Sequence, residues 1–333
     1  TTIIIALITY CIAPIVATQP SWFYVMVVVT VLLFTELKHT FTELAQRMKN
    51  DEMITLAKFL AISGIILPML PNENLIPDIN LTPYTVWLAT VVVSGISYLS
   101  YLLRRYVFHE SGILVSGIIG GLYSSTATIS VLARKSRKAP AQEAPEYAAA
   151  MLLAVSMMFL RFLILIGIFS KEILVAIYPY LLIMSLVTAG VAWYLHRKRK
   201  QVPVTDEEAE EEDTSNPLEF KVALIFAVLF VVFTIVTHYT LLYTGTGGLN
   251  VLSFIAGLSD ITPFILNLLQ GSGVAVMVVT ACCMQAIVSN IAINMCYALF
   301  FAGGKSPLRR WVLRGFGGVI AINVCLLLFF YLL

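Results

Sequence analysis

Residues 112–135 read GILVSGIIGGLYSSTATISVLARK, and residues 248–270 read GLNVLSFIAGLSDITPFILNLLQ. Each stretch is apolar, contains glycine near its middle and has polar residues directly after the glycine. These features predict two half-helices joined at a break, because a half-helix of about ten residues rises about 15 Å, half the apolar thickness of a bilayer. We therefore expect two re-entrant hairpins, with hinges at Gly120 and Gly121 and at Gly257.

The composition is that of a multi-pass membrane protein, because 59% of the 333 residues are hydrophobic and only 12% are charged. So few charges exclude a soluble domain with a charged surface. Eleven apolar stretches are long enough to approach or cross a hydrocarbon core of about 30 Å. If two of them turn back as hairpins, the sequence predicts an all-α polytopic membrane protein with about nine transmembrane helices and two re-entrant hairpins.

The basic residues support the hairpins through the positive-inside rule, which places Lys and Arg at the cytoplasmic ends of spans. If all eleven stretches crossed the membrane, the basic clusters at 134–138 and 197–200 would lie outside. If both hairpins leave on the side from which they enter, 19 of the 21 Lys and Arg residues are cytoplasmic, Lys171 is outside and Arg161 lies within a span. The alternative is a kinked but complete spanning helix, in which the glycines serve close helix packing.

The two stretches also align with each other at an offset of 136 residues, which predicts an internal repeat. The matched pairs are Gly121 and Gly257, Ser124 and Asp260, Thr126 and Thr262, and, after small gaps, Ser156 and Ser289, and Arg161 and Asn294. Each copy has one span, one hairpin and two more spans. Because three crossings are an odd number, the second copy is expected to be inverted relative to the first, as in many secondary transporters.

The repeat divides the chain into four parts. They are residues 1–70, N-terminal helices that form a scaffold or an oligomer contact; 82–200, the first repeat with its hairpin at 112–135; 201–217, an acidic cytoplasmic linker; and 217–333, the second repeat with its hairpin at 248–270. Because the chain begins with Thr1 rather than Met, we expect the N-terminal part to be truncated.

The predicted binding site lies at the two hairpin tips, which are expected to meet near the middle of the membrane. Half-helix N-termini offer unpaired N–H donors and partial positive charge, which suit an anionic or carbonyl-bearing solute. An acidic residue such as Asp260 within an apolar segment is instead typical of a proton carrier or cation ligand. The candidate substrate- or ion-binding residues are Ser124, Ser125, Thr126, Thr128, Arg161, Ser259, Asp260, Thr262, Asn290 and Asn294.

Structural roles for these polar residues are an open alternative. Asn290, Asn294 and Asn323 are also typical of interhelical hydrogen bonds, and Arg161 paired with Asp260 would hold the two repeats together. The His, Cys, Asp and Glu residues show no metal-ligand spacing, so we expect neither a metal nor a cofactor. The sequence contains neither a catalytic motif nor a nucleic-acid-binding motif, which predicts that the protein is not an enzyme and has no nucleic-acid partner.

The stretches GGLYSSTATISVLARKS (120–136) and AGLSDITPFILNLLQG (256–271) resemble bacterial membrane proteins in which an MgtC/SapB-type N-terminal region precedes the domain of unknown function numbered 4010. The resemblance covers residues 20–333, and GGLxSSTA is its most specific part. It implies a loose link to magnesium but no substrate. Arg161 matches the basic residue of that family, whereas Thr262 and Asn294 stand where its members tend to have acidic and basic residues. These differences argue against a strictly acidic metal site.

Together these features predict a secondary transporter of the bacterial inner (cytoplasmic) membrane. It would move a small polar or anionic solute by alternating access around the hairpin tips, coupled to protons or Na⁺. The alternatives are a passive ion or solute channel with the same fold, and a magnesium-related divalent-cation transporter or non-transporting membrane regulator. The expected partners are the solute or ion, the lipid bilayer and, in a homodimer, a second copy of the chain.

Overall fold

The computed structural model describes residues 62–74, 76, 79, 81–103, 112–198, 220–270, 274–304 and 306–332, together with isolated positions before residue 61. The chain divides into two compact units, Thr1–Ala61 and Ile62–Leu333. The spans expected before residue 54 lie almost entirely outside the described residues, and so does the linker expected at 201–217. The following description concerns the second unit.

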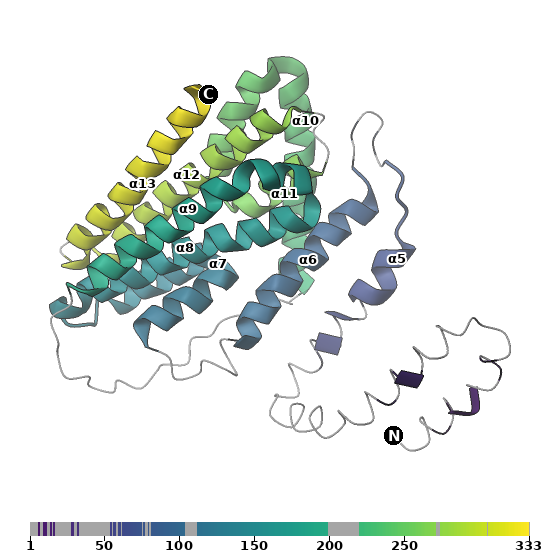
Figure 1. Cartoon of the computed structure of the whole chain (residues 1–333), viewed down its shortest axis with the longest axis horizontal. Helices are drawn as coiled ribbons and strands as arrows, with labels where there is room; N and C mark the ends of the chain where they lie inside the picture. The colour runs from purple at the N-terminus through teal and green to yellow at the C-terminus, as the bar shows by residue number, and fades with distance from the viewer. Residues whose placement is uncertain are drawn as a thin grey trace. The chain divides into compact units, whose positions relative to one another are not determined.

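The second unit is helical throughout its described residues (Figure 1). Its elements are the π-helical turn η1 (Ile62–Ile66), α5 (Leu67–Met69), α6 (Pro83–Leu102), α7 (Ile113–Lys135), the 3₁₀ turn η3 (Ala141–Glu143), α8 (Ala144–Phe169), α9 (Lys171–His196), α10 (Phe220–Ala256), α11 (Ile261–Leu269), α12 (Val276–Ala302) and α13 (Leu308–Leu332). Seven of these, α6 to α10, α12 and α13, are long and apolar enough to cross a membrane. The protein is therefore a multi-pass membrane protein.

Local sequence explains where two of the long helices begin. Thr82 and Thr85 form a reciprocal cap at the start of α6, in which each hydroxyl accepts a hydrogen bond from the backbone N–H of the other. Pro83 follows at the first helical position, where its missing N–H is not needed. At the start of α9 the Ser170 hydroxyl accepts a hydrogen bond from the N–H of Ile173 at 3.3 Å. These caps satisfy donors that would otherwise be unpaired in lipid.

Helix α7 is broken at Ser124, whose φ of −158° and ψ of 109° are extended rather than helical. A Cβ placed on Gly120 would lie 2.5 Å from the Oγ1 atom of Thr128. Eight residues of continuous helix would separate these positions by about 12 Å, so the chain turns back at Ser124. Gly120 and Gly121 lie inside the first half-helix, and the predicted hinge at these two residues is therefore displaced to Ser124.

The second glycine-containing stretch is also divided into two short helices. Helix α10 contains a non-helical residue at Gly245, whose φ of +65° lies in the left-handed region that favours glycine. The chain continues as helix to Ala256, leaves the helical conformation between Gly257 and Asp260, and resumes as α11. The break thus begins at Gly257, the predicted hinge residue, and a re-entrant hairpin over 248–270 stays a prediction.

Contacts between the helices follow a paired pattern. Within the sets, the contact of α6 with α7 corresponds to that of α10 with α11, α7 with α8 to α11 with α12, and α8 with α9 to α12 with α13. Between the sets, α7 with α12 corresponds to α11 with α8, and α8 with α13 to α12 with α9. Exchanging the first set of helices, α6 to α9, for the second set, α10 to α13, maps these pairs onto each other, whereas the extensive contact of α10 with α12 has no comparable counterpart between α6 and α8. Such an exchange is what the predicted internal repeat requires.

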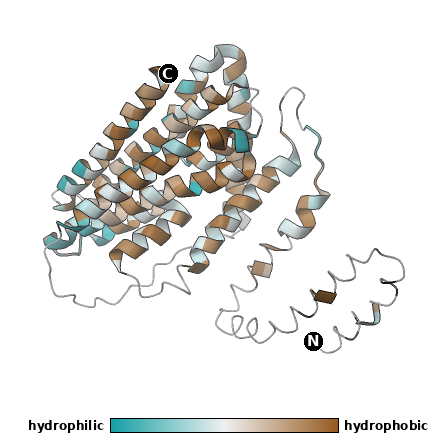
Figure 2. Ribbon diagram, viewed as in Figure 1, coloured by the Kyte–Doolittle hydropathy of each residue, from teal (hydrophilic) through white to brown (hydrophobic). Residues whose placement is uncertain are grey.

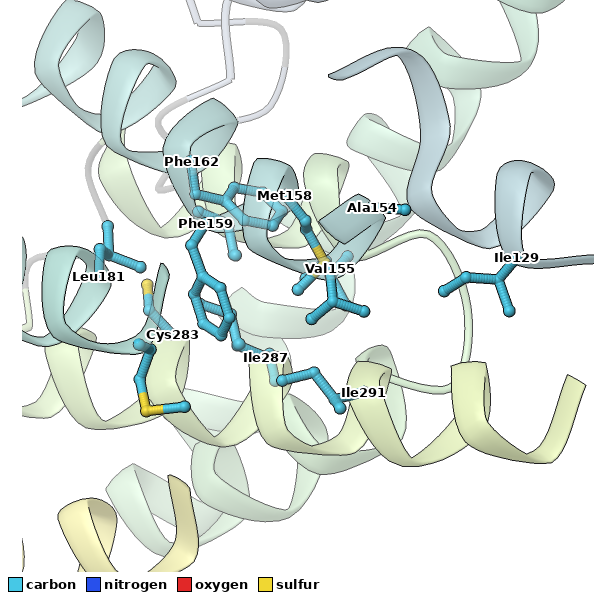
Figure 3. Close-up of a cluster of buried hydrophobic side chains, with 14 of the residues drawn as sticks. Ile129, Ala154, Val155, Met158, Phe159, Phe162, Leu181, Cys283, Ile287 and Ile291 are labelled. Carbon is cyan, nitrogen blue, oxygen red and sulfur yellow. The ribbon is translucent and has the colours of Figure 1, made fainter. Parts of the chain in front are cut away.

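The core lies between the two central helices of these sets, α8 and α12. Figure 3 shows their side chains pointing toward one another, with further contributions from α7 and α9. The labelled residues of this cluster are Ile129, Ala154, Val155, Met158, Phe159, Phe162, Leu181, Cys283, Ile287 and Ile291. Helices α10 and α13 are the least buried of the long helices, so their apolar faces are available to lipid.

Candidate functional site

The break in α7 is stabilised by two polar contacts. The Ser124 hydroxyl accepts a hydrogen bond from the backbone N–H of Ala127 at 3.3 Å, as an N-cap does. The carbonyl oxygen of Tyr123 accepts a hydrogen bond of 2.8 Å from the Nη1 atom of Arg161, which lies on α8. The polar groups released by the break are therefore bound by a local side chain and by a guanidinium from the next helix.

The break between α10 and α11 is stabilised in the same way. Asp260 is the N-cap of α11, and its Oδ1 atom accepts a hydrogen bond from the N–H of Thr262 at 3.0 Å. The side-chain amide of Asn290, on α12, donates to the carbonyl oxygens of Gly257 at 3.2 Å and Ser259 at 3.3 Å. The expected half-helix N-terminus is thus present, with Asp260 as its cap.

The contacts at the two breaks are equivalent under the sequence offset of 136 residues. Ser124 and Asp260 occupy matching positions and both cap the second half-helix. Tyr123 and Ser259 also match, and the carbonyl of each accepts from a side chain on the helix that follows its own break. The donor is a guanidinium in the first set of helices and a carboxamide in the second. The two sites therefore share the capping position and the carbonyl acceptor but differ in the charge of the donor.

Arg161 is the residue that relates the two breaks to each other. Its guanidinium contacts the first break through Tyr123, and it also interacts electrostatically with the carboxylate of Asp260 at the second break. No oxygen of Asp260 lies within 4.0 Å of Arg161, so the pair attracts without forming a salt bridge. The Nε atom of Arg161 is buried and has no hydrogen-bond partner. A buried donor without a partner requires an explanation, and a bound water, ion or solute is one.

Burial separates the predicted site residues into two groups. Ser259 and Asp260 are exposed, and Ser124, Thr126 and Arg161 are partly exposed. The remaining predicted residues, Ser125, Thr128, Thr262, Asn290 and Asn294, are buried. Asp260 therefore does not occupy the buried environment that its position in an apolar segment had suggested.

The asparagines have different roles. Asn294 donates to the Oδ1 atom of Asn290 at 3.1 Å, while its own Oδ1 atom is buried without a partner. Asn290 thus links Asn294 to the second break. Asn323 instead accepts a hydrogen bond of 2.6 Å from the hydroxyl of Tyr180, which joins α13 to α9. The predicted interhelical role fits Asn323, whereas Asn290 and Asn294 lie at the candidate site.

Two features of the polar interior were not predicted from the sequence. One is the carbonyl of Tyr123, which becomes an acceptor only because the break falls at Ser124. The other is a polar network beside the second break, in which the Ser253 hydroxyl donates to Gln285 at 2.6 Å and the Gln285 amide donates to Tyr331 at 2.8 Å. Gln285 within an apolar span was the sequence signal for this network.

The candidate site contains groups that attract charges of both signs. They are two capped half-helix N-termini, hydroxyl groups, a guanidinium and one exposed carboxylate. Half-helix N-termini and a guanidinium attract negative charge, whereas the carboxylate attracts a proton or cation. Among the described residues no three His, Cys, Asp or Glu side chains come together as metal ligands.

Comparison with known proteins places these features within a sequence family. Residues 91–302 match the family described as Domain of unknown function (DUF4010). A relative from Aquifex aeolicus (strain VF5), described as an uncharacterized protein, is 26% identical over 201 residues, which cover 58% of this chain and 84% of the relative. No solved structure matches the chain. The matched range contains both helix breaks, whereas the expected MgtC/SapB-type N-terminal region lies before it and stays a prediction.

Proposed function

The chain belongs to the DUF4010 family, and from the two equivalent helix breaks within the family's range we propose that it is a secondary transporter. It moves a small polar or anionic solute by alternating access around the breaks at Ser124 and at Gly257–Asp260. The observation that supports this function most directly is the position of Arg161, which donates to the carbonyl of Tyr123 at the first break and is near enough to Asp260, the cap of the second, for an electrostatic interaction.

The proposed topology places both broken helices in the membrane as re-entrant hairpins. Support comes from the return of the chain at Ser124 and from the two short helices that flank residues 257–260. Each half-helix of about ten residues reaches about 15 Å, the middle of the apolar layer. The distribution of Lys and Arg favours entry of the first hairpin from the cytoplasm and of the second from outside.

Alternating access follows from the inverted relation between the two proposed repeats. If the second repeat has the opposite orientation, the two repeats are related by a two-fold axis in the plane of the membrane. Each conformation of one hairpin then has a two-fold-related counterpart in the other. Exchanging the two conformations opens the shared site to the other side of the membrane. The helix contacts that are shared by the two sets support an internal repeat, and the distribution of Lys and Arg supports its inversion.

The solute class is proposed from the groups that surround the breaks. A carboxylate, oxyanion or carbonyl group would accept hydrogen bonds from the half-helix N–H groups and from Arg161. Asp260, exposed and close enough to interact with Arg161, is the proposed position for a coupling proton or Na⁺. Binding of a cation there reduces the attraction between Asp260 and Arg161, which frees the guanidinium for the solute.

Transport can be tested with the full chain reconstituted into liposomes. Uptake of labelled phosphate, sulfate, acetate and succinate would be measured with and without an imposed proton or Na⁺ gradient. We expect at least one of these anions to show saturable uptake that a gradient drives above the equilibrium level. Flux that rises linearly with concentration and ignores the gradient would indicate a passive channel, and absence of flux for all four would contradict the proposed solute class.

The hairpin topology predicts which positions are reached from the same side. In a variant without native cysteines, single cysteines at Gly112 and Lys138 should both react with a membrane-impermeant maleimide from the cytoplasmic side. Cysteines at Gly247 and Gln270 should both react from the opposite side. Labelling of Gly112 and Lys138 from different sides would mean that α7 crosses the membrane, and the inverted repeat would then be wrong.

The two roles of Asp260 can be separated by comparing two substitutions. Asp260→Asn removes the charge but keeps an oxygen that can cap α11, whereas Asp260→Ala removes both and should cost about 1 kcal/mol of local helix stability. If the charge couples transport, both variants lose gradient-driven uptake, and only Asp260→Ala shows faster hydrogen exchange in residues 261–269. Full gradient-driven uptake by Asp260→Asn would restrict Asp260 to a capping role.

A further inference from the structure

One end of the bundle has a positively charged surface. It is formed where α7 and α9 end and α13 begins, and Figure 2 shows hydrophilic residues gathered at the start of α13 and the neighbouring helix ends. Its exposed cations are Arg134, Arg137, Arg197, Lys198, Arg309, Arg310 and Arg314, named here the basic rim. This surface lies at the ends of the helices, away from the helix breaks, and the proposed transport mechanism does not use it.

Contacts between the helices hold the basic rim together. The Arg134 guanidinium lies 4.4 Å from the ring centroid of Phe301, and Arg137 donates to the carbonyl of Phe300 at 3.2 Å. Both contacts fix the end of α7 against the end of α12. A Cβ on Gly315 would lie 3.1 Å from the Cδ1 atom of Leu195, so the last turn of α9 packs against the first turns of α13. Three helices thus contribute cations to one surface.

Aromatic rings accompany the cations of the rim. Arg197 lies 5.1 Å from the ring centroid of Trp193, Lys198 lies 5.3 Å from that of Tyr194, and Arg314 lies 5.8 Å from that of Trp311. Trp193 and Tyr194 are themselves exposed. Trp and Tyr occupy the headgroup level of a bilayer, so these pairs place their cations at the depth of lipid phosphates.

Among the residues that the structure describes, the cations of the basic rim form no ion pair. None of the seven cations of the rim lies within 4.0 Å of a carboxylate among the residues that the structure describes. Arg309 and Arg310 also stand in the first turn of α13, which has no acidic residue. Positive side chains at a helix N-terminus are unfavourable because that end is already partly positive. An external anion would therefore stabilise the rim.

We propose that the basic rim is a binding surface for anionic phospholipid headgroups. Guanidinium groups bind phosphate oxygens with two parallel hydrogen bonds, and the rim supplies six arginines for this geometry. The interfacial aromatic residues select a phosphate at the membrane surface over one in bulk water. The bound class is a phosphodiester lipid with net negative charge, such as phosphatidylglycerol, rather than a zwitterionic lipid.

The fluorescence of the rim tryptophans provides a direct test. Two of the four tryptophans of the chain, Trp193 and Trp311, lie in the rim, and Trp22→Phe with Trp87→Phe leaves these two as reporters. The protein would be placed in bilayers that contain brominated phosphatidylglycerol or brominated phosphatidylcholine at equal mole fraction. We expect brominated phosphatidylglycerol to bind about fivefold more strongly than brominated phosphatidylcholine, as judged by quenching. Equal quenching by the two lipids, measured in this protein with its rim arginines unaltered, would overturn the proposal.

A matched pair of variants tests the role of the arginines. The triple change Arg309→Gln, Arg310→Gln and Arg314→Gln should reduce the preference for phosphatidylglycerol to less than about twofold. Lys171→Gln, at an exposed position outside the rim, should leave the preference unchanged. If the triple variant has a lower melting temperature than the unaltered chain, Arg310→Gln alone should still give an intermediate preference. A preference that is kept in both rim variants would overturn the proposal.

A competition arm distinguishes the lipid from a soluble anion. Excess inorganic phosphate is added to the phosphatidylglycerol bilayers, and potassium chloride of equal ionic strength is added to a parallel sample. The proposal expects the same partial loss of quenching in both samples, because both salts only screen the charge. Loss of the preference with phosphate alone would show that the rim binds free phosphate, which would overturn the assignment to lipid.

Discussion

Replacing Gly121 with alanine is expected to destabilise the protein, while the same replacement at Gly190 is expected to leave it unchanged or slightly more stable. A Cβ on Gly121 would lie 2.5 Å from the Cα of Ala154 and 2.7 Å from its carbonyl oxygen. These are backbone atoms of α8, so the two helices must move apart. Overpacking of this kind costs about 1–3 kcal/mol. A Cβ on Gly190, in α9, would have no atom within 4 Å.

The second set of helices contains the counterpart of this contact. A Cβ on Gly257 would lie 2.5 Å from the carbonyl oxygen of Ala286 on α12, so Gly257→Ala should be destabilising as well. Apparent melting temperatures of the purified variants, with Gly190→Ala as the control, measure these effects. Each of the three Gly→Ala variants adds a single methyl group. Similar melting temperatures for the three variants would contradict the close packing of each hairpin against the helix that follows it.

Replacing Arg161 with alanine is expected to reduce solute uptake by about 100-fold or more. The change removes the donor to the Tyr123 carbonyl and leaves Asp260 without the cation that it faces. A 100-fold slower rate corresponds to a transport barrier that is about 2.7 kcal/mol higher. Arg161→Lys, which keeps the charge but not the planar geometry, should retain part of the activity.

The coupling between Arg161 and Asp260 can be measured with a double-mutant cycle. Initial uptake rates would be compared for Arg161→Ala, Asp260→Asn and the double variant, with Lys171→Ala as a control for removal of an exposed cation. If the two charges act together, the double variant loses less activity than the product of the single losses predicts. Wild-type uptake by Arg161→Ala, with an intact melting transition, would remove this residue from the mechanism.

Much of the fold could be predicted from local sequence. The existence of two divided helices followed from the glycines and the polar residues after them, and Ser124 and Asp260, which cap the second half-helices, are of residue types that favour N-cap positions. Capping is predictable because it depends on a few residues that are adjacent in the chain. The family assignment to the domain of unknown function 4010 was likewise confirmed over residues 91–302.

The positions of the breaks and the roles of the glycines could not be predicted in the same way. The first break lies at Ser124 rather than at Gly120 and Gly121, because Gly121 is needed inside the helix for its close approach to Ala154. A glycine that allows backbone contact and a glycine that forms a hinge look alike in the sequence. The contact with Ala154 distinguishes Gly121 from a hinge glycine, and Ala154 lies more than 30 residues further along the chain.

The sequence by itself determined that the protein is a helical membrane protein, that two of its apolar stretches are interrupted, and which side chains cap the interruptions. These properties depend on composition and on neighbouring residues. The tertiary structure alone decided that Arg161 donates to the carbonyl of Tyr123 and lies near enough to Asp260 for an electrostatic interaction, and that Asn290 donates to the equivalent carbonyl of Ser259. These contacts join residues that are 31 to 99 positions apart, and packing of the helices, not local preference, brings such residues together.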